Sequence, residues 1–193
     1  MNYIIKCEGK TDEELVPLVL ENQSYFLCLM EKYESKLLRY IMRISNVRYE
    51  DAEDVLQEVF IKVYENLNGF DPDLKFSSWV YRIAHNHVIS EFRKKRNQTE
   101  IILSEEEDWQ NFVSDLDIAD QVDIQLSKEV INKVLNSLDV KYREVLFLKF
   151  LEERDYKEIS DILKKPMGTV ATLINRAKEK FKKELVKQNI KIL

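Results

Sequence analysis

The chain has 193 residues, of which 45% are hydrophobic and 34% charged, with only three glycines and three prolines. This length suits one large domain or two small ones of about 80 residues each. Few turn-forming residues and many aliphatic and charged ones predict an all-α protein. No apolar stretch approaches the ~18 residues of a membrane span. The short apolar stretch at the N-terminus, followed by acids, argues against a secretory signal peptide.

The two cysteines predict no metal site. Cys7 and Cys28 match neither a CxxC motif nor a metal-ligand spacing, so reduced thiols in a cytoplasmic protein are expected. No cofactor is indicated.

Charge is segregated along the chain. The net charge of −5 argues against nucleic-acid binding, but totals mislead when charges separate. Basic clusters lie at 93–96 and at 178–183, whereas residues 97–127 contain acids and no Lys or Arg. This interval also lacks a sustained apolar period, so it predicts a flexible acidic linker between two domains.

The helices follow in chain order. Thr11 and Glu14 form a capping-box pattern that opens a first helix, which ends near Glu21. Apolar periodicity predicts further helices over 24–44, 50–67, from Ser77 or Ser78 to 93, 128–136, 141–151, 156–163 and 168–187. Pro72 predicts a loop before the helix that begins at Ser77 or Ser78.

The helix over 50–67 has two distinct faces. Ala52, Leu56, Val59 and Val63 form a core stripe. Asp51, Asp54 and Glu58 fall together on another side, where their mutual repulsion costs stability. A solvated acidic face and a docking patch for a basic partner both explain them.

The next helix carries a polar strip opposite an apolar half. The strip contains Trp79, Arg82, Asn86, Ser90 and Arg93. Arg neutralises phosphate, Trp stacks on an unpaired base and Asn reads a base edge, so the strip indicates nucleic-acid contact. An ordinary solvated face with a part-buried Trp79 is the alternative. His85 and His87 lie on opposite sides of this helix and cannot bind one metal ion together.

Residues 156–178 have the form of a helix-turn-helix. Pro166 prevents helix continuation across the turn. The second helix turns Val170, Ile174, Ala177 and Phe181 inward. It leaves outside the residues suited to phosphate contact and major-groove entry, which are Thr169, Thr172, Asn175, Arg176 and Lys180. The basic run that follows favours DNA binding.

Three segments together resemble one family. Asp51-Ala-Glu-Asp-Val-Leu-Gln-Glu-Val-Phe60, Phe76-Ser-Ser-Trp-Val-Tyr-Arg-Ile-Ala-His-Asn86 and Val145 to Phe181 are similar, in the correct order, to the extracytoplasmic-function (group IV) sigma factors of the sigma-70 family. The resemblance runs from about Thr11 to Lys187. It implies a region 2 helical bundle over 11–96, an acidic linker over 97–126 and a region 4 helix-turn-helix domain over 127–187. It also implies that the polymerase, not this chain, is the enzyme.

The resemblance assigns roles to particular residues. A coiled coil on the largest polymerase subunit would contact Asp51, Asp54, Gln57, Glu58 and Phe60. The minus-ten element would contact Phe76, Ser77, Trp79, Arg82, Asn86, Arg93 and Lys94, with a flipped base held by the loop 69–77. The minus-thirty-five element would contact Thr169, Val170, Ala171, Thr172, Asn175, Arg176 and Lys180. The implied partners are core RNA polymerase with its beta and beta-prime subunits, promoter DNA and an anti-sigma factor.

The chain departs from the family pattern at several positions. His85 replaces the usual Arg and Ser90 the usual Asp, while Ala171 and Leu173 replace basic residues. Lys164 occupies the place of the turn glycine, which would cost about 1 kcal/mol if that position is left-handed. The alternatives to a sigma factor are a free-standing helix-turn-helix regulator, a structural adaptor, and a helical enzyme, for which no nucleophile–base pair or ligand cluster is found.

Overall fold

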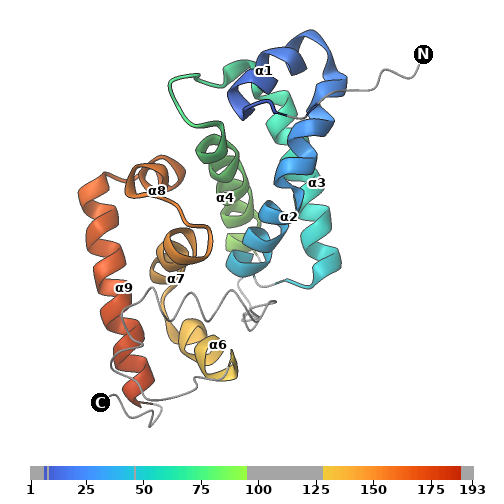
Figure 1. Ribbon diagram of the computed structural model, residues 1–193. Helices are drawn as coiled ribbons and strands as arrows, with labels where there is room; N and C mark the ends of the chain where they lie inside the picture. Colours follow the sequence, from blue (N-terminus) through green and yellow to red (C-terminus); the bar gives the residue numbers. More distant parts are fainter. Residues whose placement is uncertain (1–6, 8, 46, 95–127, 188–193) are drawn as a thin grey trace.

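The structure is a computed structural model that describes residues 7, 9–45, 47–94 and 128–187, with backbone alone at 92–94 and 128. Every regular element in these ranges is helical. Figure 1 shows two groups of helices lying side by side. The first unit contains α1 (Asp12–Glu21), α2 (Phe26–Ser45), α3 (Tyr49–Glu65) and α4 (Phe76–Lys94), with short 3-10 turns at Gln23–Tyr25 and Leu67–Gly69. The second unit contains α6 (Lys128–Ser137), α7 (Val140–Leu146), α8 (Tyr156–Leu163) and α9 (Met167–Lys187). The predicted linker, 97–126, lies outside the described residues.

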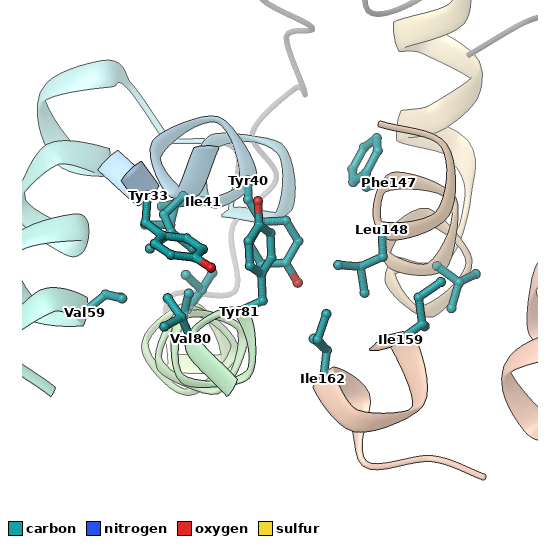
Figure 2. Packing of buried hydrophobic residues seen from close by; sticks show 14 of the residues in the cluster. Tyr33, Tyr40, Ile41, Val59, Val80, Tyr81, Phe147, Leu148, Ile159 and Ile162 are labelled. Atoms are coloured by element: carbon teal, nitrogen blue, oxygen red, sulfur yellow. The ribbon is translucent and has the colours of Figure 1, made fainter. Parts of the chain in front are cut away.

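The first unit forms because each of its helices buries one apolar stripe. The stripes of α2, α3 and α4 meet around Ile41, Val59 and Val80, each at most 1% exposed, and Figure 2 shows these side chains on the inner side of the unit. α1 begins as predicted: the Glu14 amide donates to Thr11 Oγ1 at 3.2 Å, and the Thr11 amide donates to Glu14 Oε2 at 2.8 Å. The capping box therefore satisfies amides that the first helical turn leaves unpaired.

The start of α4 differs from the prediction. The helix begins at Phe76 rather than at a serine cap, and Ser78 is 1% exposed. The Phe76 amide instead donates to Glu13 Oε1 of α1 at 3.2 Å. A carboxylate from a helix far away in the sequence thus caps α4 in place of the expected local serine. Its negative charge is stabilised by the positive end of the helix dipole.

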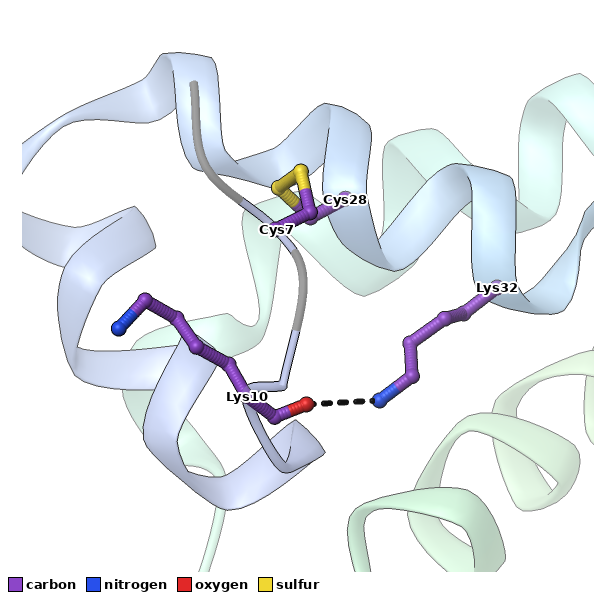
Figure 3. Close-up of a disulfide and its surroundings, with 4 residues drawn as sticks. All are labelled: Cys7, Lys10, Cys28 and Lys32. Atoms are coloured by element: carbon purple, nitrogen blue, oxygen red, sulfur yellow. Dashed lines mark hydrogen bonds between the residues drawn. A yellow bond between two sulfur atoms is a disulfide. The ribbon is translucent and has the colours of Figure 1, made fainter.

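The prediction of reduced, unpaired cysteines is wrong for this structure. Cys7 and Cys28 form a disulfide whose Cα atoms lie 5.5 Å apart. Figure 3 shows how the chain before α1 runs along α2, where Lys32 Nζ donates to the Lys10 carbonyl at 3.2 Å. The same ammonium lies 2.6 Å from Asp12 Oδ1. The pairing depends on this tertiary contact and not on a local motif, so cysteine spacing did not predict it.

The second unit is built around α9. Along this helix Val170, Ile174, Ala177, Phe181 and Leu185 are buried, at most 2% exposed, and α6, α7 and α8 all pack against it. α7 continues into a π-helical turn, Phe147–Leu151. α8 opens with a second capping box, in which the Glu158 amide donates to Asp155 Oδ1 at 2.8 Å and the Asp155 amide to Glu158 Oε2 at 3.0 Å. The helix-turn-helix prediction is confirmed.

The turn between α8 and α9 is left-handed at Lys164, with φ 52° and ψ 46°. A Cβ atom in this conformation is strained by about 1 kcal/mol. Replacing Lys164 with glycine is therefore expected to raise the free energy of unfolding by about 0.5–1 kcal/mol. Urea denaturation measures this difference. Lys164→Ala keeps the Cβ atom and is the matched control, and an equal gain in both variants would place the effect in the lysine side chain instead.

The two units are in contact. α4 packs against α8, and α2 packs against α7. In Figure 2, Tyr40 and Tyr81 of the first unit lie opposite Leu148 and Ile162 of the second. The buried side chains of both units thus form one continuous cluster.

Candidate polymerase and nucleic-acid interfaces

The predicted acidic face lies on α3 and is open to solvent. Asp51, Asp54, Gln57 and Glu58 are all exposed. Arg48 Nε approaches Asp51 Oδ2 at 3.6 Å across the first turn. Glu58 Oε2 lies 2.9 Å from His87 Nε2 of α4. This leaves Asp54 as the carboxylate whose charge is least engaged by the described part of the chain.

Phe60 does not belong to this open face. It is 6% exposed, and its ring meets that of Phe26 edge-on with centroids 6.3 Å apart. A partner could touch it only if these helices moved. The neighbouring Ile61 is 57% exposed, three residues beyond Glu58 and four beyond Gln57, so it shares their side of the helix. Ile61 was assigned to neither face from the sequence, although its spacing from Gln57 and Glu58 is the signal that places it beside them.

The polar strip of α4 is partly confirmed. Asn86 and Ser90 are exposed and Arg82 is half-buried. Together with the end of α3 they line a hollow of about 530 Å³, within the roughly 300–1,000 Å³ typical of ligand sites. Its other lining residues are Lys62, Glu65, Asn66, Gly69, Trp79, Ile83 and His87.

Two predicted DNA-contacting aromatics are core residues instead. Phe76 is 0% exposed and Trp79 is 5% exposed. Phe70, from the loop before α4, packs edge-on against both rings, with centroids 5.3 Å and 5.5 Å away. The helical period placed Trp79 on the strip correctly, but it could not show that a loop would cover that end of the strip. Ser77 is half-buried, and the side chains of Arg93 and Lys94 lie outside the described residues.

The two histidines have separate environments, as predicted. His85 Nδ1 lies 3.1 Å from the Tyr40 hydroxyl of α2, while His87 faces Glu58 of α3. Burial, together with the nearby charge of Lys165, lowers the pKa of His85 to about 4. His85 is therefore neutral at physiological pH and serves as a buried hydrogen-bond partner.

α9 presents a polar face next to the turn. Thr169, Thr172, Asn175, Arg176 and Lys180 are exposed. Val170 is 0% exposed, so its predicted base contact is wrong for this structure; Ala171 is half-buried. The Thr172 hydroxyl donates to the Gly168 carbonyl at 2.8 Å, which fixes its orientation on the helix. The remaining face combines a cation, an amide and hydroxyls, the side chains that read groove edges and phosphates.

The described residues contain neither a metal-binding cluster nor a membrane-spanning helix. No group of three or more His, Cys, Asp or Glu side chains in those ranges could bind a metal ion. None of the helices described combines the length and apolar character needed to cross a bilayer.

A helix-turn-helix unit joined to a second helical bundle, each with an open polar face, defines a two-domain protein of the DNA-binding helix-turn-helix class. Residues 29–98 match the family described as Sigma-70 region 2, and residues 128–181 match Sigma-70, region 4.

Individual relatives agree with this match. The chain is 36% identical to the ECF RNA polymerase sigma factor SigW of Bacillus subtilis over 85% of this chain and 90% of that one. It is 31% identical to the ECF RNA polymerase sigma-E factor of Escherichia coli K12 over 89% and 93%. The chain therefore belongs to the ECF RNA polymerase sigma factors of the sigma-70 family.

Solved structures share the fold. CnrH in complex with the cytosolic domain of CnrY aligns with a TM-score of 0.67 at 23% identity, covering 91% of this chain and 97% of that one. The sigma factor RpoE in complex with the anti-sigma factor NepR from Bartonella quintana aligns with a TM-score of 0.56 at 19% identity, covering 81% and 96%.

Proposed function

We propose that this chain, as a group IV sigma factor, binds core RNA polymerase and directs it to promoters that contain minus-ten and minus-thirty-five elements. The single observation that carries this proposal is the ordered match of both sigma regions together with near-complete coverage of curated sigma factors. No nucleophile–base pair is needed, because the polymerase supplies the chemistry.

The polymerase-binding surface in this proposal is the open side of α3. Asp51, Asp54 and Glu58 supply negative charge, Gln57 supplies an amide, and Ile61 supplies an apolar contact among them. Interfaces combine such an apolar centre with a polar rim. The acidic charges suit a basic coiled coil on the beta-prime subunit and guide its approach.

The minus-ten surface in this proposal is the hollow between α3 and α4. Arg82 and Asn86 line it beside Gly69, which begins the loop expected to hold a flipped base. A hollow of this size receives a nucleobase whose pairing is already broken, and the amide and guanidinium offer donors to its edge. Trp79, which is 5% exposed, also lines this hollow and packs against Phe70.

The minus-thirty-five surface in this proposal is the polar face of α9, with Thr169, Thr172, Asn175, Arg176 and Lys180. The first helix of the pair, α8, would lie across the phosphate backbone while α9 enters the major groove. An anti-sigma factor is a further proposed partner, because the structural neighbour RpoE was solved in complex with the anti-sigma factor NepR.

Run-off transcription tests the proposed function. Core RNA polymerase is incubated with fragmented genomic DNA, with and without this protein. New discrete start sites that share upstream motifs at two positions are expected. Absence of new starts together with absence of co-elution with core polymerase would favour the free-standing regulator, which explains α9 but leaves the α3 face without a role.

Reversing one charge on α3 tests the polymerase surface separately. Asp54→Lys is expected to weaken binding to core polymerase by about tenfold or more, because attraction becomes repulsion. Asp54 is preferable to Glu58, whose carboxylate also contacts His87. Co-elution or a titration with labelled protein measures the affinity. Glu31→Lys, at an exposed position of α2, changes the net charge equally and is expected to bind normally; equal weakening by both variants would refute a local surface.

A further inference from the structure

The turn of the helix-turn-helix contains a strained lysine. Lys164 ends α8 in the left-handed region, at φ 52° and ψ 46°, where the backbone crowds a Cβ atom and glycine is the usual residue. The Lys165 amide donates to the Ser160 carbonyl at 3.2 Å, and the Ser160 hydroxyl donates to the Lys165 carbonyl at 2.5 Å. These two hydrogen bonds fix the turn. Strain that the surrounding structure holds in place in this way concentrates at functional sites.

The side chain of Lys164 is exposed. The next residue, Lys165, is half-buried, and its charge acts on His85 and Glu144. Lys164 has no carboxylate partner in the part of the chain that the structure describes. The two neighbouring lysines therefore differ: Lys165 is engaged within the protein, whereas Lys164 offers its ammonium group to solvent.

Positive charge near the start of α9 comes from the turn. Residues 162–178 contain four Lys or Arg and no Asp or Glu, although the net charge of the chain is −5. Within α9 the first cation is Arg176, since residues 167–175 are all uncharged. The exposed polar residues of this stretch are Thr169, Thr172 and Asn175. Hydroxyl and amide groups hydrogen-bond to base edges, but they do not neutralise the charge of a phosphate, which is what cations contribute to DNA binding.

The position of Lys164 suits a phosphate at the border of the groove. If α9 enters the major groove, which is about 12 Å wide, the phosphates of both strands border the helix. Lys164 lies three residues before Met167, the first residue of α9, so their Cα atoms are at most about 11 Å apart. The flexible four-carbon stem of a lysine carries its ammonium outward from there. A point charge placed beside the end of the helix meets the DNA backbone and not the base edges.

We propose that Lys164 contacts a phosphate of the minus-thirty-five duplex and supplies the positive charge that the first turns of α9 lack. The inference rests on the proposed function and adds a backbone-contacting residue to it. Lysine binds phosphate as a point charge, so this contact contributes affinity and orientation but carries no sequence information. Glycine at position 164 would relax the turn and leave that phosphate without its cation.

Three substitutions at Lys164 separate the effect of its charge from that of its backbone conformation. Holoenzyme is assembled from core polymerase and each full-length variant. Its binding to a promoter fragment identified by run-off transcription is titrated at low temperature and several salt concentrations. Lys164→Ala and Lys164→Gly are both expected to weaken binding by about fivefold to tenfold near 0.1 M salt, and to reduce the slope of log K against log salt by about one unit. Lys164→Arg keeps the charge and is expected to match wild type.

The matched control is Lys133→Ala. Lys133 is an exposed lysine of α6, and Figure 1 shows α6 near the end of α9 opposite the turn. This variant loses the same charge and is expected to bind like wild type.

Neutral phosphates locate the contact on the DNA. Methylphosphonate groups replace the phosphates of the minus-thirty-five duplex one at a time. Wild-type holoenzyme is expected to lose affinity at one position where the Lys164→Ala holoenzyme loses none. Base substitutions in the element are expected to weaken both holoenzymes by the same factor, because a phosphate contact does not read sequence.

The outcomes separate this contact from the proposed function. Wild-type affinity and salt dependence in Lys164→Ala overturn the contact. Weak binding by the alanine variant with normal binding by the glycine variant also overturns it, because the conformation of the turn and not the charge would then be responsible. In both cases promoter-dependent starts from wild type leave the proposed function standing. If wild type gives no promoter-dependent starts, the proposed function fails and the contact fails with it.

Discussion

Replacing Trp79 with alanine is expected to lower the free energy of unfolding of the first unit by about 3–5 kcal/mol, the cost of removing a large buried aromatic. Trp79 is 5% exposed and packs with Phe70 and Phe76. Its removal leaves a cavity under the loop before α4, because a loop anchored by Phe70 cannot collapse into the space without losing its own contacts. A residue that only stacked on DNA would leave stability unchanged.

Urea denaturation of Trp79→Ala measures this loss. Asn86→Ala, at an exposed position on the same strip, is the matched control and is expected to change stability by less than about 0.5 kcal/mol. Polymerase binding and promoter opening should fall together in the Trp79 variant. A Trp79 variant with wild-type stability and a defect confined to promoter opening would show that the side chain acts on DNA.

Replacing Glu144 with glutamine is expected to stabilise the protein at pH 8 by about 3 kcal/mol. Burial raises the pKa of Glu144 from 4.5 to about 7, although Lys165 and Arg143 oppose the shift. Each tenfold change in proton affinity corresponds to 1.36 kcal/mol, so this difference amounts to about 3 kcal/mol. Tyr40 of α2 also faces this carboxyl group.

The sign of the Glu144 effect follows from linkage. The folded state retains the proton up to about pH 7, whereas the unfolded state loses it near the ordinary pKa of 4.5. The wild-type protein therefore loses stability as the pH rises from about 4.5 through 7. Glutamine imitates the protonated acid, so the two proteins should be equally stable near pH 4.5 and diverge above it.

Denaturation of wild type and Glu144→Gln at a series of pH values checks this divergence. His85 works in the opposite direction: its pKa is lowered from 6.5 to about 4, so its contribution is lost as the pH falls. The contribution of His85 is the same in both proteins, so it cancels when their free energies of unfolding are subtracted at each pH. Glu179→Gln, at an exposed position of α9, controls for the loss of one surface charge. A stability difference between the two proteins that does not vary with pH would refute a raised pKa of Glu144 in the folded state.

Local patterns predicted most of the helical architecture. The capping box at Thr11 and Glu14 and the apolar periods of the two helices of the helix-turn-helix depend on residues within a few positions of each other, and the structure contains them. The possible left-handed conformation of Lys164 was suggested by the family resemblance, and the structure has it. The exposed acids of α3 and the polar residues of α9 were also placed correctly, since helical periodicity determines which residues share a face. Their contacts with polymerase and DNA stay predictions.

Features that depend on distant residues were missed. A helical wheel cannot show that Phe70 covers Trp79, or that Phe26 covers Phe60. The cap of α4 by Glu13 and the disulfide between Cys7 and Cys28 likewise join separate elements. Arg43 and Glu152 are 109 residues apart, and nothing local to either residue indicates that they meet in a buried ion pair.

Docking within one chain also sets a requirement for competitors. Two units joined within one chain meet at an effective concentration in about the millimolar range. A protein present at micromolar concentration that targets the docked surface of α4 or α8 alone must therefore bind it about a thousand times more tightly than the other unit does. A competitor that binds both units at once avoids this disadvantage. After its first contact has formed, its second contact is intramolecular as well. The contact between α4 and α8 thus favours bivalent ligands over monovalent ones.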